Sequence, residues 1–202
     1  SQSSRKESFM KYWKIVLTIW MSLLLGVSFA QGFQPGDKVA DFTLADAAGK
    51  SHKLSDYTGK PAIVLIYVST VCPVSNAYNE RMAALYNDYS GKNVVFLGIN
   101  SNKKETPAEI AQHAKSNGLK FPILKDENNV VADQYDATVT PEVYLLDGNL
   151  TLQYHGNIDD SQRPNQVKQN SLRNALDELL AGKPVSEKST KAFGCSIKRN
   201  RK

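Results

Sequence analysis

The run AIVLIYV, at residues 62–68, requires a fold that covers a strand on both of its faces. It is uncharged and rich in β-branched side chains, and it lacks the apolar–polar alternation of a strand with one solvated face. A second run of the same kind, VVFLGI, occupies residues 94–99. Strands of this type are typical of α/β domains, in which helices cover both faces of a largely parallel sheet.

Helical and extended patterns alternate along the rest of the chain. Thr106, Pro107 and Glu109 form the sequence of an N-terminal capping box. We expect helices at residues 73–89, 107–118, 130–135 and 165–181, further strands at residues 121–124, 142–146 and 151–154, and a hairpin at residues 41–54. The fold class is therefore α/β, with a mixed central sheet flanked by helices. We expect one domain over residues 31–183, which begins with the hairpin, and a C-terminal tail over residues 184–202.

The net charge of +5 is carried by the two ends of the chain. Lysine and arginine are concentrated in residues 1–30 and 184–202, and the segment between them is mildly acidic. A chain with this charge pattern has no basic face for nucleic acid, so we exclude a nucleic-acid partner. We expect the KRNRK end of the tail, which follows Cys195, to be solvated.

Residues 1–30 have the pattern of a signal peptide with an upstream extension over residues 1–9. After Met10 come two lysines, an apolar stretch at residues 15–27 and small residues before Gln31, as at a leader-peptidase site. A helix needs about 20 apolar residues to cross a bilayer core, and this stretch is shorter, which favours a leader that is removed. The alternative is that the leader is retained as a membrane anchor. We therefore expect an exported protein, periplasmic or extracellular, that meets the membrane only through its leader during export.

One of the two cysteines follows the first buried strand, in the sequence STVCPVS at residues 69–75. This layout places Cys72 at the carboxyl end of a central strand and at the N-cap of the next helix, with Pro73 at the first helical position. Backbone N–H groups at such an N-cap can lower the pKa of a thiol to about 3.5–7.5, from about 8.5. We expect Cys72 to be a nucleophilic thiolate; the alternative is a buried cysteine that only packs.

Four segments carry a resemblance to a known group of proteins. They are PGDKVADFTL at residues 35–44, CPVSNAYNERM at 72–82, YHGNIDD at 154–160 and GCSIK at 194–198. With these segments the chain resembles the thioredoxin-like superfamily. Within it, the chain is most similar to the redoxin branch of alkyl hydroperoxide reductase and thiol-specific antioxidant proteins, which are peroxiredoxin-like. The resemblance implies a thioredoxin-like fold and covers nearly the whole chain after the leader.

The resemblance also implies roles for single residues. Cys72 would be the attacking thiol, and Ser75 stands where a thioredoxin has its second cysteine. Pro141 resembles the cis-proline that faces the active cysteine, which would leave the backbone of Thr140 free to pair with a bound peptide or thiol. A trans proline that begins an edge strand is the alternative. Ser69 matches the serine or threonine that peroxiredoxins carry three residues before their reactive cysteine. We expect the substrate or partner to bind at Ser69, Pro73, Ser75, Thr140 and Pro141.

Other positions depart from these families. Leu65 stands where peroxiredoxins carry a proline, and the expected last hairpin lacks the arginine with which they hold peroxide. Arg81 lies on the same expected helix as Cys72 but about half a turn round it, so we expect it to point elsewhere. Thioredoxins have a buried acid in the strand before the cysteine, where this chain is uncharged. Proton transfer would then use Tyr67, Glu142 or water.

Cys195 is the second cysteine and lies in the expected tail. Ser75 cannot resolve an oxidised Cys72, and the chain after Gly182 is long enough to bring Cys195 to it. We therefore expect a Cys72–Cys195 disulfide in one oxidised state, with residues 184–193 as a mobile strap. The alternative is a tail cysteine that stays free or pairs between chains.

Two classes of function fit these residues. The first is an exported thiol-dependent oxidoreductase of antioxidant type with Cys72 and Cys195 as catalytic residues, which either reduces peroxide or exchanges disulfides with a thiol/disulfide partner protein. The alternative is a non-enzymatic exported module with a structural disulfide between these cysteines. Neither class requires a cofactor. The three histidines, His52, His113 and His155, are far apart in the sequence, so we expect surface positions and no metal site.

Overall fold

The two apolar runs form neighbouring parallel strands at the centre of a seven-stranded sheet. The computed structural model describes residues 32–199, so the expected leader lies outside the described residues. The strands of the sheet are β1 (Thr43–Asp46), β2 (Ser51–Lys53), β3 (Ile63–Tyr67), β4 (Val95–Asn100), β5 (Ile123–Lys125), β7 (Glu142–Leu146) and β8 (Leu152–Gly156). Their order is β2-β1-β5-β4-β3-β7-β8, in which β3, β4 and β5 are parallel and the remaining neighbours are antiparallel. The predicted mixed sheet is confirmed.

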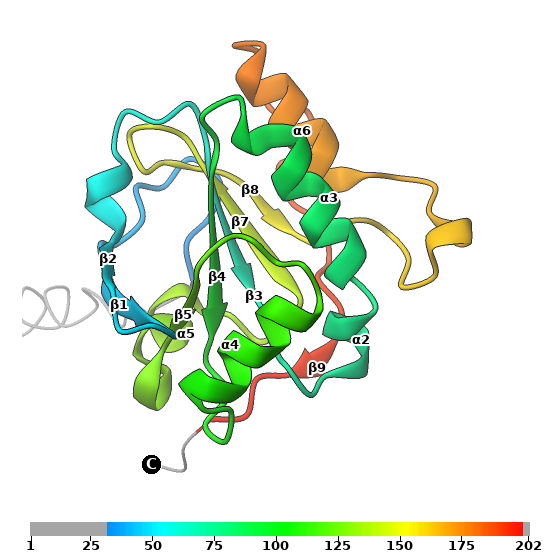
Figure 1. Cartoon of the computed structure of the whole chain (residues 1–202). Coiled ribbons are helices and arrows are strands. Elements are labelled where there is room, and N and C mark those ends of the chain that lie inside the picture. The colour runs from blue at the N-terminus through cyan, green and yellow to red at the C-terminus, as the bar shows by residue number, and fades with distance from the viewer. Residues whose placement is uncertain (1–31, 200–202) are drawn as a thin grey trace, which may run out of the picture. The chain divides into compact units, whose positions relative to one another are not determined.

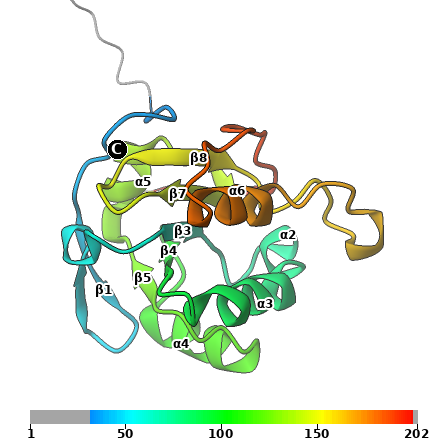
Figure 2. The ribbon, with the colours of Figure 1, turned by 90° about the horizontal axis from the view of Figure 1, so that it is seen from above.

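Helices cover both faces of this sheet, as its uncharged central strands require. The helices are α2 (Pro73–Asn76), α3 (Asn79–Ser90), α4 (Pro107–Ser116), α5 (Val130–Tyr135) and α6 (Ser171–Leu180), with 3-10 turns η1 (Leu54–Tyr57), η2 (Glu127–Asn129) and η3 (Pro164–Gln166). Helices α3, α4 and α6 lie on one face and α5 lies on the other (Figures 1 and 2). Within residues 32–199, no helix is long and apolar enough to cross a membrane.

Side chains of β3 alternate between the two cores that these helices form. Val64 and Ile66 pack in the core with α3, α4 and α6, whereas Leu65 and Tyr67 pack in the core with α5. All four side chains are fully buried. Because both faces of β3 are packed against other elements, its carboxyl end is a rigid support for Cys72, which follows it.

The helix expected at residues 73–89 is divided into α2 and α3. The N–H of Tyr78 bonds to the carbonyl oxygen of Ser75, only three residues back, which tightens the chain and separates the two helices. The start of α4 agrees with the prediction, since Thr106 and Glu109 form the complete capping box.

The last helix is shorter than the expected range of residues 165–181. It begins at Ser171, because the carboxylate of Asp160 accepts the backbone N–H groups of residues 168–169 and holds the preceding segment as a loop. A side-chain acceptor that competes with the helical carbonyls delays the start of the helix.

Part of the segment 184–199 is fixed on the domain, whereas the KRNRK end that we expected to be solvated lies largely outside the described residues, so that expectation stays a prediction. A short strand, β9 (Cys195–Ser196), pairs antiparallel with β6 (Val139–Thr140), and Figure 1 shows β9 beside α2. Before it, the backbone of His155 in β8 forms two hydrogen bonds with residues 188–190. The strap therefore runs beside the outer strand of the sheet, and its mobility stays a prediction.

Candidate active site

A disulfide joins Cys72 and Cys195, with their Cα atoms 5.9 Å apart. The two residues are 123 positions apart in the sequence. The predicted pairing is therefore confirmed, and the alternatives of a free or an interchain tail cysteine do not apply to this state. The catalytic role of each cysteine stays a prediction.

The start of α2 surrounds Cys72 with backbone donors. Cys72 is the N-cap of α2, Pro73 is the exposed first helical residue, and the N–H of Ser75 donates to the Sγ atom of Cys72 at 3.3 Å. Only 3% of Cys72 is exposed. After reduction the same N–H group would face a thiolate, which it stabilises relative to the protonated thiol. The arrangement can thus generate a nucleophile and, in the reverse step, a good leaving group.

The peptide bond between Thr140 and Pro141 is cis, as the resemblance implied, so the trans alternative is wrong. The carbonyl oxygen of Thr140 lies 3.4 Å from the Sγ atom of Cys72. Thr140 is paired with Cys195 of β9. The backbone that we expected to be free for a partner is therefore occupied by the chain's own C-terminal segment in the oxidised state.

Ser69 lies behind Cys72, where it contacts other protein groups. Its side chain is buried, and its Oγ atom accepts the N–H groups of Val71 and Cys72 at 3.3 and 3.1 Å. The hydroxyl donates to Glu105 with an oxygen–oxygen distance of 2.6 Å. Ser75 is also buried, and its hydroxyl oxygen accepts the N–H of Ser69. Both serines therefore stabilise the turn that carries Cys72.

Glu105 is a buried residue of this site that the sequence reasoning missed. It lies in the loop between β4 and α4, 36 positions from the Ser69 that it contacts. Its second carboxylate oxygen accepts the N–H of Thr70 at 2.6 Å. No motif in the sequence marks Glu105, which reaches Ser69 only because β3 and β4 are neighbours in the sheet.

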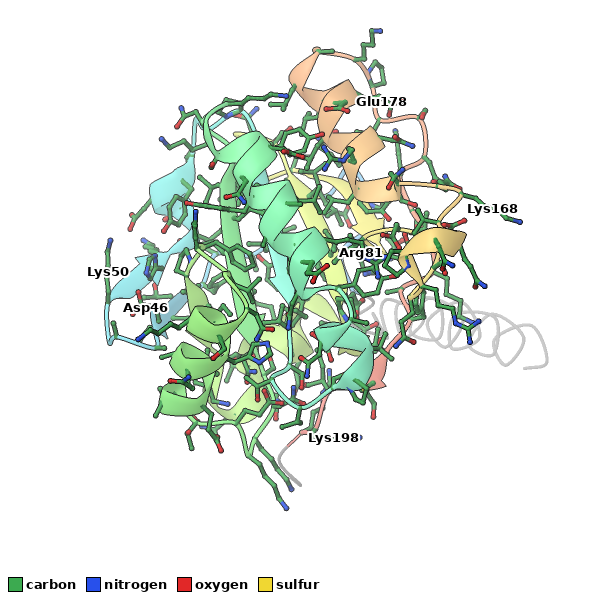
Figure 3. The ribbon with its side chains drawn as sticks, turned by 45° about the vertical axis from the view of Figure 1, so that its right-hand side comes forward. Asp46, Lys50, Arg81, Lys168, Glu178 and Lys198 are labelled. Carbon is green, nitrogen blue, oxygen red and sulfur yellow. A yellow bond between two sulfur atoms is a disulfide. The ribbon has the colours of Figure 1, made fainter. Side chains whose placement is uncertain are left out.

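The arginines that flank the two cysteines in the sequence are both engaged in ion pairs. Arg81 binds Asp159 with a shortest nitrogen–oxygen distance of 2.6 Å, and its guanidinium group lies over the ring of Tyr78. Arg199 pairs with Asp133. Figure 3 shows Arg81 projecting from α3 toward the loop that carries Asp159. The expectation that Arg81 points away from Cys72 agrees with these contacts.

The two side-chain candidates for proton transfer are hydrogen-bonded to other groups, and the choice among them and water stays open. Burial raises the pKa of Tyr67 well above its ordinary value, and its hydroxyl donates to the carbonyl oxygen of Val131. The carboxylate of Glu142 accepts the backbone N–H groups of residues 138–139 and bonds to the ring of His155 at 2.7 Å. Glu142 therefore holds β6, the strand that pairs with β9, in place.

We expect Glu142→Gln to remove a pH-dependent contribution to stability. Burial raises the pKa of Glu142, but hydrogen bonds from His155 and from the backbone lower it to a net value below the ordinary 4.5. A carboxyl with a lowered folded-state pKa stabilises the fold above its unfolded-state pKa, and this contribution is lost as the pH falls through the folded-state pKa. Urea unfolding should show that the variant is less stable by about 2 kcal/mol at neutral pH and by much less near pH 3.

The matched control for this measurement is Glu80→Gln, which alters an exposed carboxylate on α3. It should leave the pH profile of the parent protein unchanged. A loss of stability in Glu142→Gln that is equal at both pH values would contradict the prediction.

The histidines differ partly from expectation. His52 is buried and bonds to Tyr57 and Asp46, so the prediction of a surface position is wrong for it. The ring finds its partners because β1, which carries Asp46, pairs with β2, and because η1, which carries Tyr57, follows β2 directly in the chain. Among residues 32–199, no three His, Cys, Asp or Glu side chains are grouped so that they could hold a metal ion.

The sequence model of the AhpC/TSA family matches residues 35–155. The chain belongs to the AhpC/TSA family. The matched range of this AhpC/TSA protein includes Cys72 and Pro141 but ends well before Cys195. The family assignment therefore applies to the strand–cysteine–helix unit and the cis-proline, whereas the pairing with Cys195 rests on the structure.

Individual relatives of this AhpC/TSA chain agree with the assignment. The thiol-disulfide oxidoreductase ResA of Geobacillus kaustophilus is 32% identical over 114 residues, which cover 56% of this chain and 64% of ResA, just under two thirds of its length. An uncharacterized conserved protein from Geobacillus kaustophilus has a crystal structure that matches with a TM-score of 0.79 at 37% identity, over 84% of this chain and 94% of that one. The thioredoxin domain of a thiol-disulfide oxidoreductase from Bacteroides vulgatus matches with a TM-score of 0.54 at 17% identity, over 60% and 86% of the two chains. The predicted thioredoxin-like fold is confirmed.

Proposed function

We propose that this protein is a thiol-disulfide oxidoreductase that exchanges disulfides with a partner protein. The observation that carries the proposal is the bond between Cys72 and Cys195, since Cys72 stands at a helix N-cap beside a cis-proline and its sulfur accepts a backbone N–H. The similarity to ResA, which is named a thiol-disulfide oxidoreductase, supports the same activity.

In the proposed reaction, the Cys72 thiolate attacks one sulfur of a partner disulfide. A mixed disulfide forms between Cys72 and the partner, and the partner's other sulfur leaves as a thiolate that takes up a proton. The thiolate of Cys195 then attacks the Sγ atom of Cys72, which releases the second partner thiol and forms the Cys72–Cys195 disulfide. Two electrons pass from the chain's dithiol to the partner disulfide, and the reaction can run in either direction according to the reduction potentials.

Peroxide reduction is the second candidate, favoured by the antioxidant proteins that give the AhpC/TSA family its name. Peroxide would convert the Cys72 thiolate to a sulfenic acid. The thiol of Cys195 would then condense with this sulfenic acid, forming the disulfide and releasing water. Two observations favour exchange. The single hydroxyl proton of Ser69 is donated to Glu105, so it is not available to a peroxide, and Arg81 is held by Asp159. We therefore place disulfide exchange first.

Kinetics of the reduced protein test the choice between these two reactions. We expect it to reduce a protein disulfide such as that of insulin faster than free cysteine does, because Cys72 is stabilised as a thiolate. In stopped-flow mixing with hydrogen peroxide, its thiol should be lost no faster than the thiol of free cysteine. Rapid loss of the thiol with peroxide, together with no exchange above the free-thiol rate, would reverse the assignment.

The reduction potential distinguishes an enzyme from a module with a structural disulfide. A potential between about −120 and −270 mV is the range of redox enzymes, whereas a value below about −300 mV is typical of structural bonds.

We also propose export to a periplasmic or extracellular compartment, with residues 1–30 as the leader. The intramolecular disulfide supports an oxidising compartment, in which such bonds form and persist.

A further inference from the structure

The loop that joins β4 to α4 carries buried polar groups for which the proposed exchange reaction has no chemical use. Asn100, Asn102 and Glu105 belong to this loop or the end of β4, and Lys125 of β5 lies against them. Each of these four side chains is at most 7% exposed. Burying a carboxylate, an ammonium group and two amides is costly unless they form hydrogen bonds, so the arrangement calls for an explanation.

One end of this loop holds the turn that carries Cys72. The carboxylate of Glu105 accepts the hydroxyl of Ser69 and the backbone N–H of Thr70, each at 2.6 Å. Because the hydroxyl proton of Ser69 is directed to Glu105, the lone pairs of its oxygen face the backbone N–H of Cys72 at 3.1 Å. A continuous set of hydrogen bonds therefore connects Glu105 to the backbone of Cys72.

The other part of the same loop holds the strand that carries Cys195. The backbone of Lys198 donates its N–H to the side-chain oxygen of Asn102 at 2.8 Å and accepts the N–H of Lys103 at 3.0 Å. Lys198, labelled in Figure 3, follows Ile197, which is buried and comes directly after β9. These contacts hold the segment after Cys195 against the domain independently of the disulfide.

Asn100 joins the two parts of the loop. Its amide nitrogen donates to Glu105 at 2.7 Å, and its amide oxygen accepts from Lys125 at 3.4 Å. The ammonium group of Lys125 also donates to the carbonyl oxygen of Asn102 at 2.7 Å. A single amide thus lies between a buried carboxylate and a buried ammonium group, and its bond to Glu105 has the short distance of a charge-assisted hydrogen bond.

We propose that residues 100–105 are a positioning element for both cysteines and that they set the equilibrium between the dithiol and the disulfide. The inference rests on the proposed exchange function and deepens it. Glu105 acts through Ser69 on the turn of Cys72, and Asn102 acts through Lys198 on the strand of Cys195. Two thiols that are held close together by the fold have a high effective concentration, which favours the disulfide. Loosening either anchor favours the dithiol and raises the reduction potential.

The test compares the reduction potentials of full-length Glu105→Gln and Asn102→Ala with that of the parent protein. Each protein is equilibrated in glutathione buffers, and its thiols are counted by alkylation and mass spectrometry. We expect each variant to lower the equilibrium constant for disulfide formation about tenfold, which corresponds to a potential about 30 mV higher. Glu105→Gln keeps the size of the side chain but removes the charge that binds Ser69 and Thr70, whereas Asn102→Ala removes the acceptor for Lys198.

Asp177→Asn is the matched control. It also changes a carboxylate to an amide, at a residue of α6 that accepts the hydroxyl of Tyr89 at 2.6 Å and contacts neither cysteine segment. We expect its potential to equal that of the parent protein even where its stability to urea is lower. If Glu105 and Asn102 had a purely structural role, the Glu105→Gln and Asn102→Ala proteins would resemble this control. Their stability to urea would be lower, and their reduction potentials would equal that of the parent protein.

Each outcome decides for or against the proposal. Potentials of both variants equal to that of the parent overturn it, and so does an equal shift in the control. A shift in Glu105→Gln alone would mean that the loop positions only Cys72, which overturns the joint role. If Glu105→Gln does not fold, Ser69→Ala replaces it, since it breaks the same connection at the hydroxyl. The proposed function is judged separately by the exchange rate of the parent protein, because the potentials are measured without a partner protein.

Discussion

Cys72→Ser is expected to abolish disulfide exchange, with a fall in rate of about a thousandfold or more. A serine hydroxyl at this N-cap is not ionised at neutral pH and cannot form a disulfide, so neither the attack on the partner nor the mixed disulfide is possible. The residue is buried beside the carbonyl of Thr140, and serine is of similar size, so the fold should persist. The rate of reduction of a protein disulfide by the pre-reduced variant provides the measurement.

Cys195→Ser is the matched control for this prediction because it removes the other sulfur of the same bond. It should still attack the partner but should stop at the mixed disulfide, which mass spectrometry detects as an adduct on Cys72. Exchange by Cys72→Ser at a rate near that of the parent protein would contradict the assignment of the nucleophile. Unchanged turnover by Cys195→Ser would contradict the resolving role.

Gly194→Ala is expected to disrupt the pairing of β9 with β6. A Cβ atom at this position would overlap the carbonyl oxygen of Thr140 and would lie 2.7 Å from its carbonyl carbon. Both atoms belong to the backbone beside the cis-proline, so they cannot rotate out of the way as the end of a flexible side chain could. We expect the free energy of unfolding of the oxidised protein to fall by about 1–3 kcal/mol in urea unfolding.

Gly91→Ala supplies a control of the same chemistry. Gly91 ends α3 with a φ of −67°, and a Cβ atom there would meet nothing within 4 Å. Since alanine adopts this conformation without strain, we expect stability equal to or slightly above that of the parent protein. A Gly194→Ala protein as stable as the Gly91→Ala protein would mean that β9 is not tightly seated in the oxidised state.

Much of the fold could be predicted because the patterns that specify it are local. Residues 62–68 predicted a strand buried on both faces, and the alternation of β3 between two cores is the reason for its uniform apolar character. Thr106 and Glu109 predicted a capping box that depends only on residues within one helical turn. The start of the last helix was missed because it depends on Asp160, whose carboxylate competes with helical hydrogen bonds over a distance of eight residues or more.

The position of Cys72 could be predicted for the same reason. The end of a buried strand, an N-cap and a following proline are neighbours in the sequence. Together they define a site whose backbone N–H groups have no partner within the helix and can donate to the Cys72 sulfur. The pairing of Cys72 with Cys195 was predicted from the chain length and from the lack of a second cysteine near Cys72. This reasoning did not show which strand the segment of Cys195 pairs with. The contact of β9 with β6 appears only when the chain is folded.

The sequence by itself determined the buried strands, the capping box and the position of Cys72 at a helix N-cap, because each depends on neighbouring residues. Only the tertiary structure decided that Glu105 holds the turn of Cys72 and that part of the segment 184–199 is fixed on the domain. In the sequence, Glu105 lies in KKETPAE, which has the pattern of an exposed loop before a helix. It is buried because the parallel pairing of β3 with β4 brings the loops that follow these strands to the same edge of the sheet. Hydrophobic periodicity reports which face of an element is covered, and it carries no information on which loops meet at the ends of the strands.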